Sequence, residues 1–134
     1  MSDTASPATH TDVYLIKLNN EIAEAGKHRP WPSGVYSKTL LKRDDQRVVL
    51  IFLDKDATIH EHHADGSISV QVLKGHISFR AADQEHDLSA SEIISLGPSV
   101  RHGVKAREES VLLLTISWPA SQTLQSMSHR GYGS

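Results

Sequence analysis

The sequence predicts an all-β domain, a sandwich or barrel of short strands that follows one short helix. Three observations lead to this prediction. From residue 35 onward, apolar and polar residues alternate with the period of a β-strand. Turn-forming pairs such as Asp65-Gly66 and Gly97-Pro98 separate these runs at close, even intervals. No long helical pattern lies among them, and many short strands at close spacing are typical of sandwiches and barrels.

The N-terminal part of the chain carries no strand pattern. Residues 1–11 offer almost nothing to bury and are predicted to be a disordered leader. Asn20 is expected to cap a short helix over residues 21–25, which Gly26 ends. An irregular connector with a proline-flanked tryptophan follows, so residues 12–34 are assigned to the helix and connector.

Nine strands are predicted in the rest of the chain. They lie at about 35–42, 46–54, 57–62, 67–74, 76–81, 85–88, 92–96, 102–106 and 110–117. The last strand is apolar on both faces, which indicates that a second sheet or a partner subunit covers its outer side. Residues 35–118 are therefore the predicted barrel. Residues 119–134 form a C-terminal tail with a helical turn expected around 123–127.

Composition narrows the class of protein. With 134 residues, the chain is predicted to form one domain. Its formal net charge of −2 gives no footprint for nucleic acid or an anionic membrane, so neither partner is expected. It has no Cys, which excludes disulfides and thiolate metal sites. Because no apolar signal segment precedes the domain and the longest apolar run, 48–53, cannot span a bilayer, a cytoplasmic protein is predicted.

The spacing of residues in the middle of the chain resembles the first motif of the cupin superfamily. That motif reads Gly, five residues, His-x-His, three or four residues, Glu, six residues and Gly. With Gly75 as the closing glycine, the opening glycine falls on Asp56 and the first histidine on His62. The second histidine and the glutamate fall on Ala64 and Ile68, neither of which can coordinate a metal.

The second cupin motif follows at the spacing that the family has. It reads Gly, five residues, Pro-x-Gly, two residues, His, three residues and Asn. Here it opens at Ser91, places its later glycine on Ser99 and its histidine on His102, and ends on Ala106. The resemblance covers residues 46–117 and implies the fold of the family, a double-stranded β-helix or jelly-roll barrel.

The resemblance also implies a metal site in the barrel. Cupin sites bind a divalent ion such as Mn, Fe, Ni or Zn through neutral imidazoles and a carboxylate. Of the family's ligand positions, His62 and His102 still carry a ligand in this chain. His60 lies two residues before His62, so an extended strand would place both side chains on one face. The three histidines are therefore predicted to hold the metal.

Three further residues are predicted to contact a small-molecule ligand. His63 faces away from the predicted metal ligands by strand alternation, unless a bulge re-aims it. Gln71 is polar among valines, and its alternation with Ile68 favours a hydrogen bond at an interface over a place in the pocket. Arg101 adjoins His102 and could meet an anionic ligand at the barrel mouth.

Two functions are compatible with these residues. One is a metal-dependent enzyme, such as a dioxygenase, isomerase or decarboxylase, that acts on a small polar molecule. The other is a degenerate, non-catalytic cupin, which binds a small molecule or serves as a structural module without metal. The sequence contains no P-loop and no Gly-x-Ser-x-Gly motif. A homodimer is expected in either case, because jelly-roll edges need covering and cupins often exchange N-terminal strands; residues 35–54 are the candidates.

Overall fold

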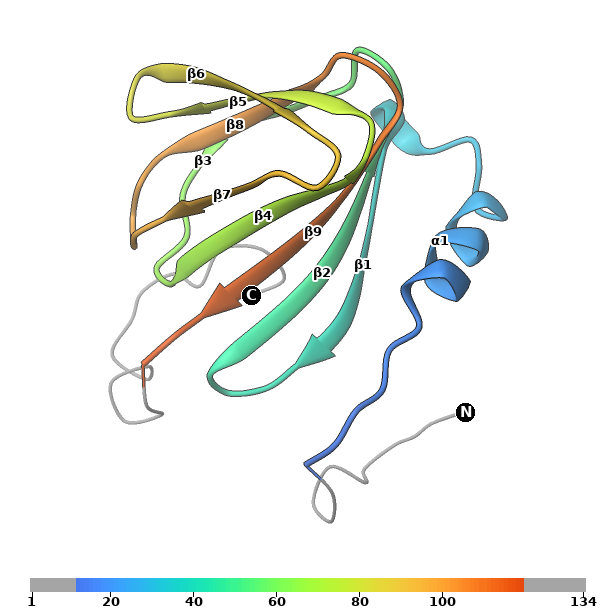
Figure 1. Cartoon of the computed structure of the whole chain (residues 1–134), viewed down its shortest axis with the longest axis horizontal. Coiled ribbons are helices and arrows are strands. Elements are labelled where there is room, and N and C mark those ends of the chain that lie inside the picture. Colours follow the sequence, from blue (N-terminus) through green and yellow to red (C-terminus); the bar gives the residue numbers. More distant parts are fainter. Residues whose placement is uncertain (1–11, 120–134) are drawn as a thin grey trace.

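The computed structural model describes residues 12–119 as two antiparallel β-sheets that face each other (Figure 1). The predicted leader, 1–11, and the predicted turn at 123–127 lie outside the described residues. The strands are β1 (Val35–Lys42), β2 (Gln46–Leu53), β3 (Thr58–His62), β4 (Ser67–Lys74), β5 (His76–Ala81), β6 (Gln84–Ser89), β7 (Ile93–Leu96), β8 (His102–Ala106) and β9 (Ser110–Ser117). All nine predicted strands are confirmed.

The two sheets differ in size and in strand order. The five-stranded sheet has the order β1-β2-β9-β4-β7, and the four-stranded sheet has the order β3-β8-β5-β6. Strands that are distant in sequence are therefore neighbours, as β2 and β9 are, which is the connectivity of a jelly roll rather than of a simple meander. The predicted all-β architecture is confirmed.

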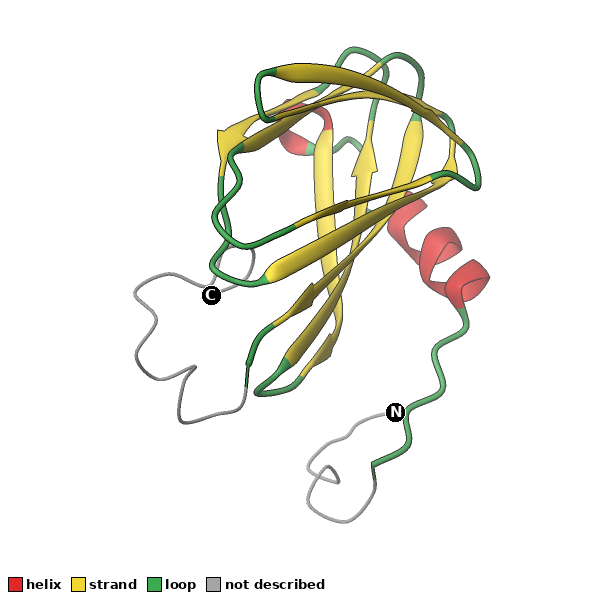
Figure 2. Ribbon diagram, turned by 60° about the vertical axis from the view of Figure 1, so that its left-hand side comes forward, coloured by secondary structure: helices red, strands yellow, loops and turns green. Residues whose placement is uncertain are grey.

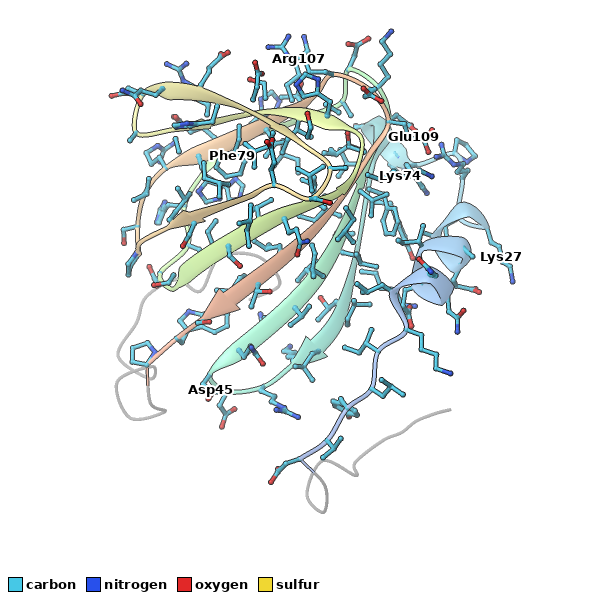
Figure 3. All side chains as sticks on the ribbon, viewed as in Figure 1. Lys27, Asp45, Lys74, Phe79, Arg107 and Glu109 are labelled. Atoms are coloured by element: carbon cyan, nitrogen blue, oxygen red, sulfur yellow. The ribbon has the colours of Figure 1, made fainter. Side chains whose placement is uncertain are left out.

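Apolar side chains fill the space between the sheets. Ile68, Val70 and Val72 point into it from β4, and Ile77 and Phe79 face them from β5. Phe79 is completely buried and lies between the two sheets in Figure 3. Burial of apolar surface stabilises a fold by about 25 cal/mol per Å², so this cluster is the main source of stability.

The outer face of the five-stranded sheet has a smaller core of its own. The helix α1 (Leu18–Gly26) and the short 3-10 turn η2 (Pro32–Gly34) precede the first strand, and α1 lies beside β1 and β2 (Figure 2). The buried residues of this outer cluster are Ala25, Trp31, Leu50, Phe52 and Val111. The indole Nε1 of Trp31 donates a hydrogen bond to the Ala25 carbonyl at 3.2 Å. The chain's own helix and tryptophan therefore cover the outer side of β9 at Val111.

The helix begins earlier than its sequence predicts. It starts at Leu18 with Lys17 in the N-cap position, so Asn20 lies inside the helix and is not its cap. Leu18 and Ile22 pack against the outer cluster, so tertiary packing sets the start of the helix rather than the best capping residue. The helix ends at Gly26, as predicted.

The backbone has a conformation that favours glycine at each position that the motif alignment assigns to glycine. The four positions that the motifs assign to glycine all have positive φ: 71° at Asp56, 94° at Gly75, 75° at Ser91 and 66° at Ser99. A residue with a Cβ adopts this left-handed region at a cost of about 1–2 kcal/mol. The positive φ at these four positions is what an alignment with the glycines of the family motifs predicts.

Gly75 differs from the other three positions in its surroundings. A Cβ at this position would lie 2.3 Å from Ser110 Oγ and 2.4 Å from the Glu109 carbonyl oxygen, so no side chain fits there. The turns at Asp56, Ser91 and Ser99 hold residues with a Cβ and require only the positive φ. Position 75 therefore requires glycine for two reasons, the positive φ and the close approach of the backbone at residues 109–110.

Candidate functional site

The candidate site lies where the end of β3 pairs with the start of β8. His62 is paired with His102, and Ile59 with Val104. Three steps along β3 thus match two steps along β8, so β3 contains a β-bulge between residues 59 and 62. Because Val104 and His102 are both buried, two residues apart on one face, the bulge turns both Ile59 and His62 toward the barrel interior.

The same bulge overturns the placement of His60 beside His62. His60 is exposed and lines a cavity on the outer face of the four-stranded sheet, whereas His62 faces His102. Strand alternation assumes an unbroken ladder, and one extra residue puts the two histidines out of phase. Within residues 12–119, no group of three or more His, Cys, Asp or Glu side chains is arranged to hold a metal ion. The structure does not assemble the predicted group of three histidines.

His62 and His102 are held in the same way. Their ring centroids are 4.5 Å apart, with the planes inclined at 55°. Nδ1 of His62 lies 2.9 Å from the His60 carbonyl oxygen, and Nδ1 of His102 lies 2.9 Å from the Val100 carbonyl oxygen. A carbonyl oxygen only accepts, so in each neutral ring the proton is on Nδ1 and the lone pair on Nε2.

Burial determines the charge state of the inner histidine. His102 is 1 % exposed and stacks on Phe79, with ring centroids 5.7 Å apart and planes only 6° from parallel. Burial is the main cause that lowers the pKa of His102 below its ordinary value of 6.5. The bond to the Val100 carbonyl raises this pKa in part, while the neighbouring His62 and His63 lower it. His102 is therefore neutral at pH 7, which is the form that binds metals.

Two of the predicted ligand contacts lie near the histidine pair. His63 directly follows β3, is half-buried, and is close enough for its charge to affect His102. Arg101 is exposed, and its Nε lies 3.4 Å from the Glu61 carboxylate. Arg101 thus lies beside the barrel mouth, where its ion pair with Glu61 joins the residue before β8 to the bulge of β3.

Gln71 lies away from this site. It is half-buried on the outer face of the five-stranded sheet, where Leu113 and Ile93 flank it on the neighbouring strands. Its predicted position on the face opposite Ile68 is confirmed, because Ile68 belongs to the inner core. The sheet separates Gln71 from the barrel interior, so the predicted contact of Gln71 with a small molecule would lie outside the barrel.

The two remaining motif positions belong to the core. Ala64 is 2 % exposed and Ile68 is 3 % exposed. The Ala64 carbonyl accepts a hydrogen bond from the Ser99 amide at 2.8 Å, which joins the loop after β3 to the loop before β8. Two neutral imidazoles side by side suit a divalent Mn, Fe, Ni or Zn ion, and two protein donors leave further positions for water or a small molecule.

Sequence reasoning missed the features that orient the two rings. The carbonyl groups of His60 and Val100 hold the imidazoles, and every residue type supplies a carbonyl, so no residue letter marks them. The bulge is equally hidden, although an unusual run of three polar residues between Ile59 and His63 lies at its position.

Comparison with known proteins identifies the fold. No protein-family model matches the sequence, and no curated protein sequence matches it. An RmlC-like cupin from Shewanella frigidimarina is similar in structure with a TM-score of 0.62, at 22 % identity, over 69 % of this chain and 83 % of that chain. A cupin superfamily protein from Desulfitobacterium hafniense has a TM-score of 0.64 at 17 % identity, over 71 % and 87 % of the two chains.

A larger protein contains a similar domain. Salicylate 1,2-dioxygenase from Pseudaminobacter salicylatoxidans matches 81 % of this chain and 34 % of its own, with a TM-score of 0.64 and 14 % identity. At these identities the likeness concerns the fold. This chain has the jelly-roll barrel fold of small cupin domains, as the resemblance implied. In the part of the chain that the structure describes, no helix is long and apolar enough to cross a membrane.

Proposed function

We propose that this small cupin domain binds a divalent transition metal through His62 and His102, and that it holds a small polar molecule at the open positions. The observation that carries the proposal is the matched orientation of the two rings. Each imidazole contacts, through Nδ1, the carbonyl oxygen two residues before it, at 2.9 Å in both cases. Metal-binding histidines are commonly oriented by such a contact of the second nitrogen.

The surroundings of the pair also support metal binding. The low pKa of His102 keeps the ring neutral, so a metal does not have to displace a proton at neutral pH. Its stacking on Phe79 fixes the plane of the ring. A bound metal would act there as a Lewis acid, which polarises a carbonyl or lowers the pKa of a water molecule. Arg101 at the rim is placed to meet an anionic group of the small molecule, in competition with Glu61.

A metal titration tests the proposal. Protein purified without a histidine tag and stripped with EDTA is titrated with Mn, Fe(II), Ni and Zn by calorimetry. We expect about one equivalent of at least one metal to bind, and His62→Ala or His102→Ala to weaken its affinity by about 100-fold. Binding of less than about a tenth of an equivalent of every metal by the parent protein would contradict the proposal.

His60→Ala is the matched control for this titration. It removes an imidazole from the neighbouring, outward-facing position but keeps the carbonyl that holds His62. We expect its metal affinity to equal that of the parent protein. A loss as large as that in His62→Ala would instead mean that the outer histidine reaches the metal, against the geometry of the bulge. Circular dichroism of each variant separates a lost ligand from a lost fold.

A second function is favoured by the residues at the other motif positions. Ala64 and Ile68 are buried in the core where the family motif has ligands, which suits a metal-free module that binds a small molecule. This alternative predicts that His62→Ala changes the free energy of unfolding by less than about 1 kcal/mol, with or without added metal. Stabilisation of the parent protein by metal, absent from His62→Ala, decides for the metal-dependent function.

We also propose that the protein is a homodimer. Within the described chain, β1 is an edge strand, and its only sheet neighbour is β2. The extended segment before α1 exposes Val13, Tyr14 and Leu15, with 78 %, 53 % and 81 % of their surfaces accessible. Residues 35–54 and this segment together suit pairing with a second copy. Light scattering at micromolar concentration tests the proposal, and a monomer would contradict it.

A further inference from the structure

The outer face of the four-stranded sheet has a cavity of about 330 Å³, on the opposite side of the sheet from the histidine pair. Its floor includes Gly103, where the backbone of β3 comes so close that a side chain would be crowded. A Cβ at Gly103 would lie 3.1 Å from the Ile59 carbonyl oxygen and 3.4 Å from the Glu61 amide nitrogen. The bulge of β3 therefore forms one wall of this cavity, which we call the outer cavity.

Two cationic side chains of the outer cavity lie beside Gly103. Arg80 is the direct partner of Gly103 on β5, and Lys105 lies two residues further along β8 on the same face. Arg80 is 3.7 Å from Glu85, and both side chains are more than half exposed, so this pair is weak. Lys105 forms no ion pair with residues 12–119 in this structure. The outer cavity thus has an available site for an anionic group.

Carboxylates occupy the two opposite walls of the outer cavity. Glu61 lies on the β3 side, next to Gly103. Glu85 lies on the β6 side, where Ser78 Oγ donates a hydrogen bond to it at 3.4 Å. A carboxylate accepts several hydrogen bonds, so both groups can also accept from a ligand. Glu61 is shared with Arg101 at the rim, 3.4 Å away, and Glu85 with Arg80, so the outer cavity presents groups of both charges.

We infer that the outer cavity binds a small zwitterion, an amino-acid-like molecule whose carboxylate lies between Arg80 and Lys105 and whose ammonium group faces Glu61. A ligand with one charge would contact only the cations or only the carboxylates, whereas a zwitterion contacts both. A volume of about 330 Å³ is at the small end of ligand sites, which suits a molecule of this size. The inference does not depend on the proposed metal site, because the sheet separates the two.

Three probes of similar size test which charges a ligand of the outer cavity must carry. The full chain, in EDTA, is titrated with 4-aminobutyrate, butyrate or butylammonium and followed by amide chemical shifts. We expect saturable shifts for residues 58–61, 78–80 and 103–105 with 4-aminobutyrate, at an affinity at least about tenfold higher than with either singly charged probe. A series from glycine to 6-aminohexanoate then shows which separation of the two charges fits best. Equal affinity for butyrate and 4-aminobutyrate would overturn the inference.

Variants of charged residues locate the binding site. Lys105→Gln and Glu61→Gln should each weaken binding of 4-aminobutyrate by about tenfold. Lys74→Gln, a change at an exposed lysine on β4 of the other sheet, should leave it unchanged. His62→Ala should also leave it unchanged, which separates this result from the fate of the metal proposal. Equal binding by Lys105→Gln and the parent, or shifts confined to His62 and His102, would contradict the inference.

Discussion

Two neighbouring rows of side chains on the inner face of the four-stranded sheet have opposite chemical character. The apolar row comprises Ile59, Val104 and Phe79, and the histidine row comprises His62, His102 and Ala81. On β8 and β5 the two rows are two residues apart, but on β3 they are three apart. Without the bulge, strand alternation would bring Glu61 into the second row in place of His62.

Residues that stabilise the fold and residues that are candidates for binding lie in neighbouring rows of the same sheet. The apolar row contributes buried hydrocarbon to the core, which stabilises the fold. The histidine row places two imidazoles in a buried environment. They are tolerated there because backbone carbonyl oxygens accept hydrogen bonds from their Nδ1–H groups. Substitutions in the first row should therefore change stability, whereas substitutions in the second should change binding and pH dependence.

The largest expected effect is on stability, in the apolar row. Phe79→Ala should lower the free energy of unfolding by about 3–5 kcal/mol, because it empties a fully buried position and removes the ring on which His102 stacks. Urea denaturation measures the change. Phe79→Leu, which keeps most of the volume, should cost less than about 1.5 kcal/mol. If His62→Ala lowers the free energy of unfolding as much as Phe79→Ala, the histidine row contributes to stability as strongly as the apolar row does.

A pH dependence should appear in the histidine row. The pKa of His102 is below 6.5 in the folded chain, so the unfolded chain takes up the proton first as pH falls. Stability is therefore complete above pH 6.5 and declines below it, by at most about 1.4 kcal/mol per pH unit, until pH reaches the folded pKa. Urea midpoints of EDTA-treated protein between pH 7.5 and 5, for the parent and His102→Gln, test this. Parallel pH profiles for the two proteins would be inconsistent with it.

The loops that lead into β3 and β8 should give a smaller effect of the opposite sign. Asp56 and Ser99 precede these strands and have positive φ. Asp56→Gly and Ser99→Gly should each raise the free energy of unfolding by about 0.5–1 kcal/mol, because relief of the left-handed strain exceeds the entropy that glycine adds to the unfolded chain. Ser69→Gly, within strand β4, is the control and should be destabilising. Destabilisation at both loop positions would contradict the account of the motifs.

The smallest effect is expected at the rim of the histidine row. Arg101 and Glu61 form an exposed ion pair, with 60 % and 45 % of their side chains accessible. Arg101→Ala should therefore change the free energy of unfolding by less than about 0.5 kcal/mol. Thermal denaturation at low and high salt measures this change. A loss above 1 kcal/mol would show that the pair helps to fix the bulge.

Much of the fold could be predicted from the sequence because its signals are local. The period of two marks the strands, and turn residues mark their ends. The spacing of Asp56, Gly75, Ser91 and Ser99 gives the motif alignment, and all four have the positive φ that glycine favours. The helix start at Leu18 could not be predicted in the same way, because packing against Trp31 and Phe52 decides it.

The candidate site was predicted only in part. His62 and His102 were correctly expected on one face, since the motif alignment fixes their positions independently of local alternation. The position of His60 could not be predicted, because strand alternation does not hold across the bulge of β3, for which a run of three polar residues is the one sequence signal. Gln71 was placed on the correct face by alternation, because β4 pairs regularly with β7 along that stretch.

The bulge in β3 also makes this strand tolerant of a change in length. In a regular strand, loss or gain of one residue turns every later side chain to the other face. Here the strand already contains one residue more than its partner requires, so a chain that lacks either His60 or Glu61 can return to regular pairing with β8. Ile59 and His62 would still face inward after such a deletion. The outer wall of the sheet can therefore diverge in sequence and in length while the inward-facing histidine stays in place.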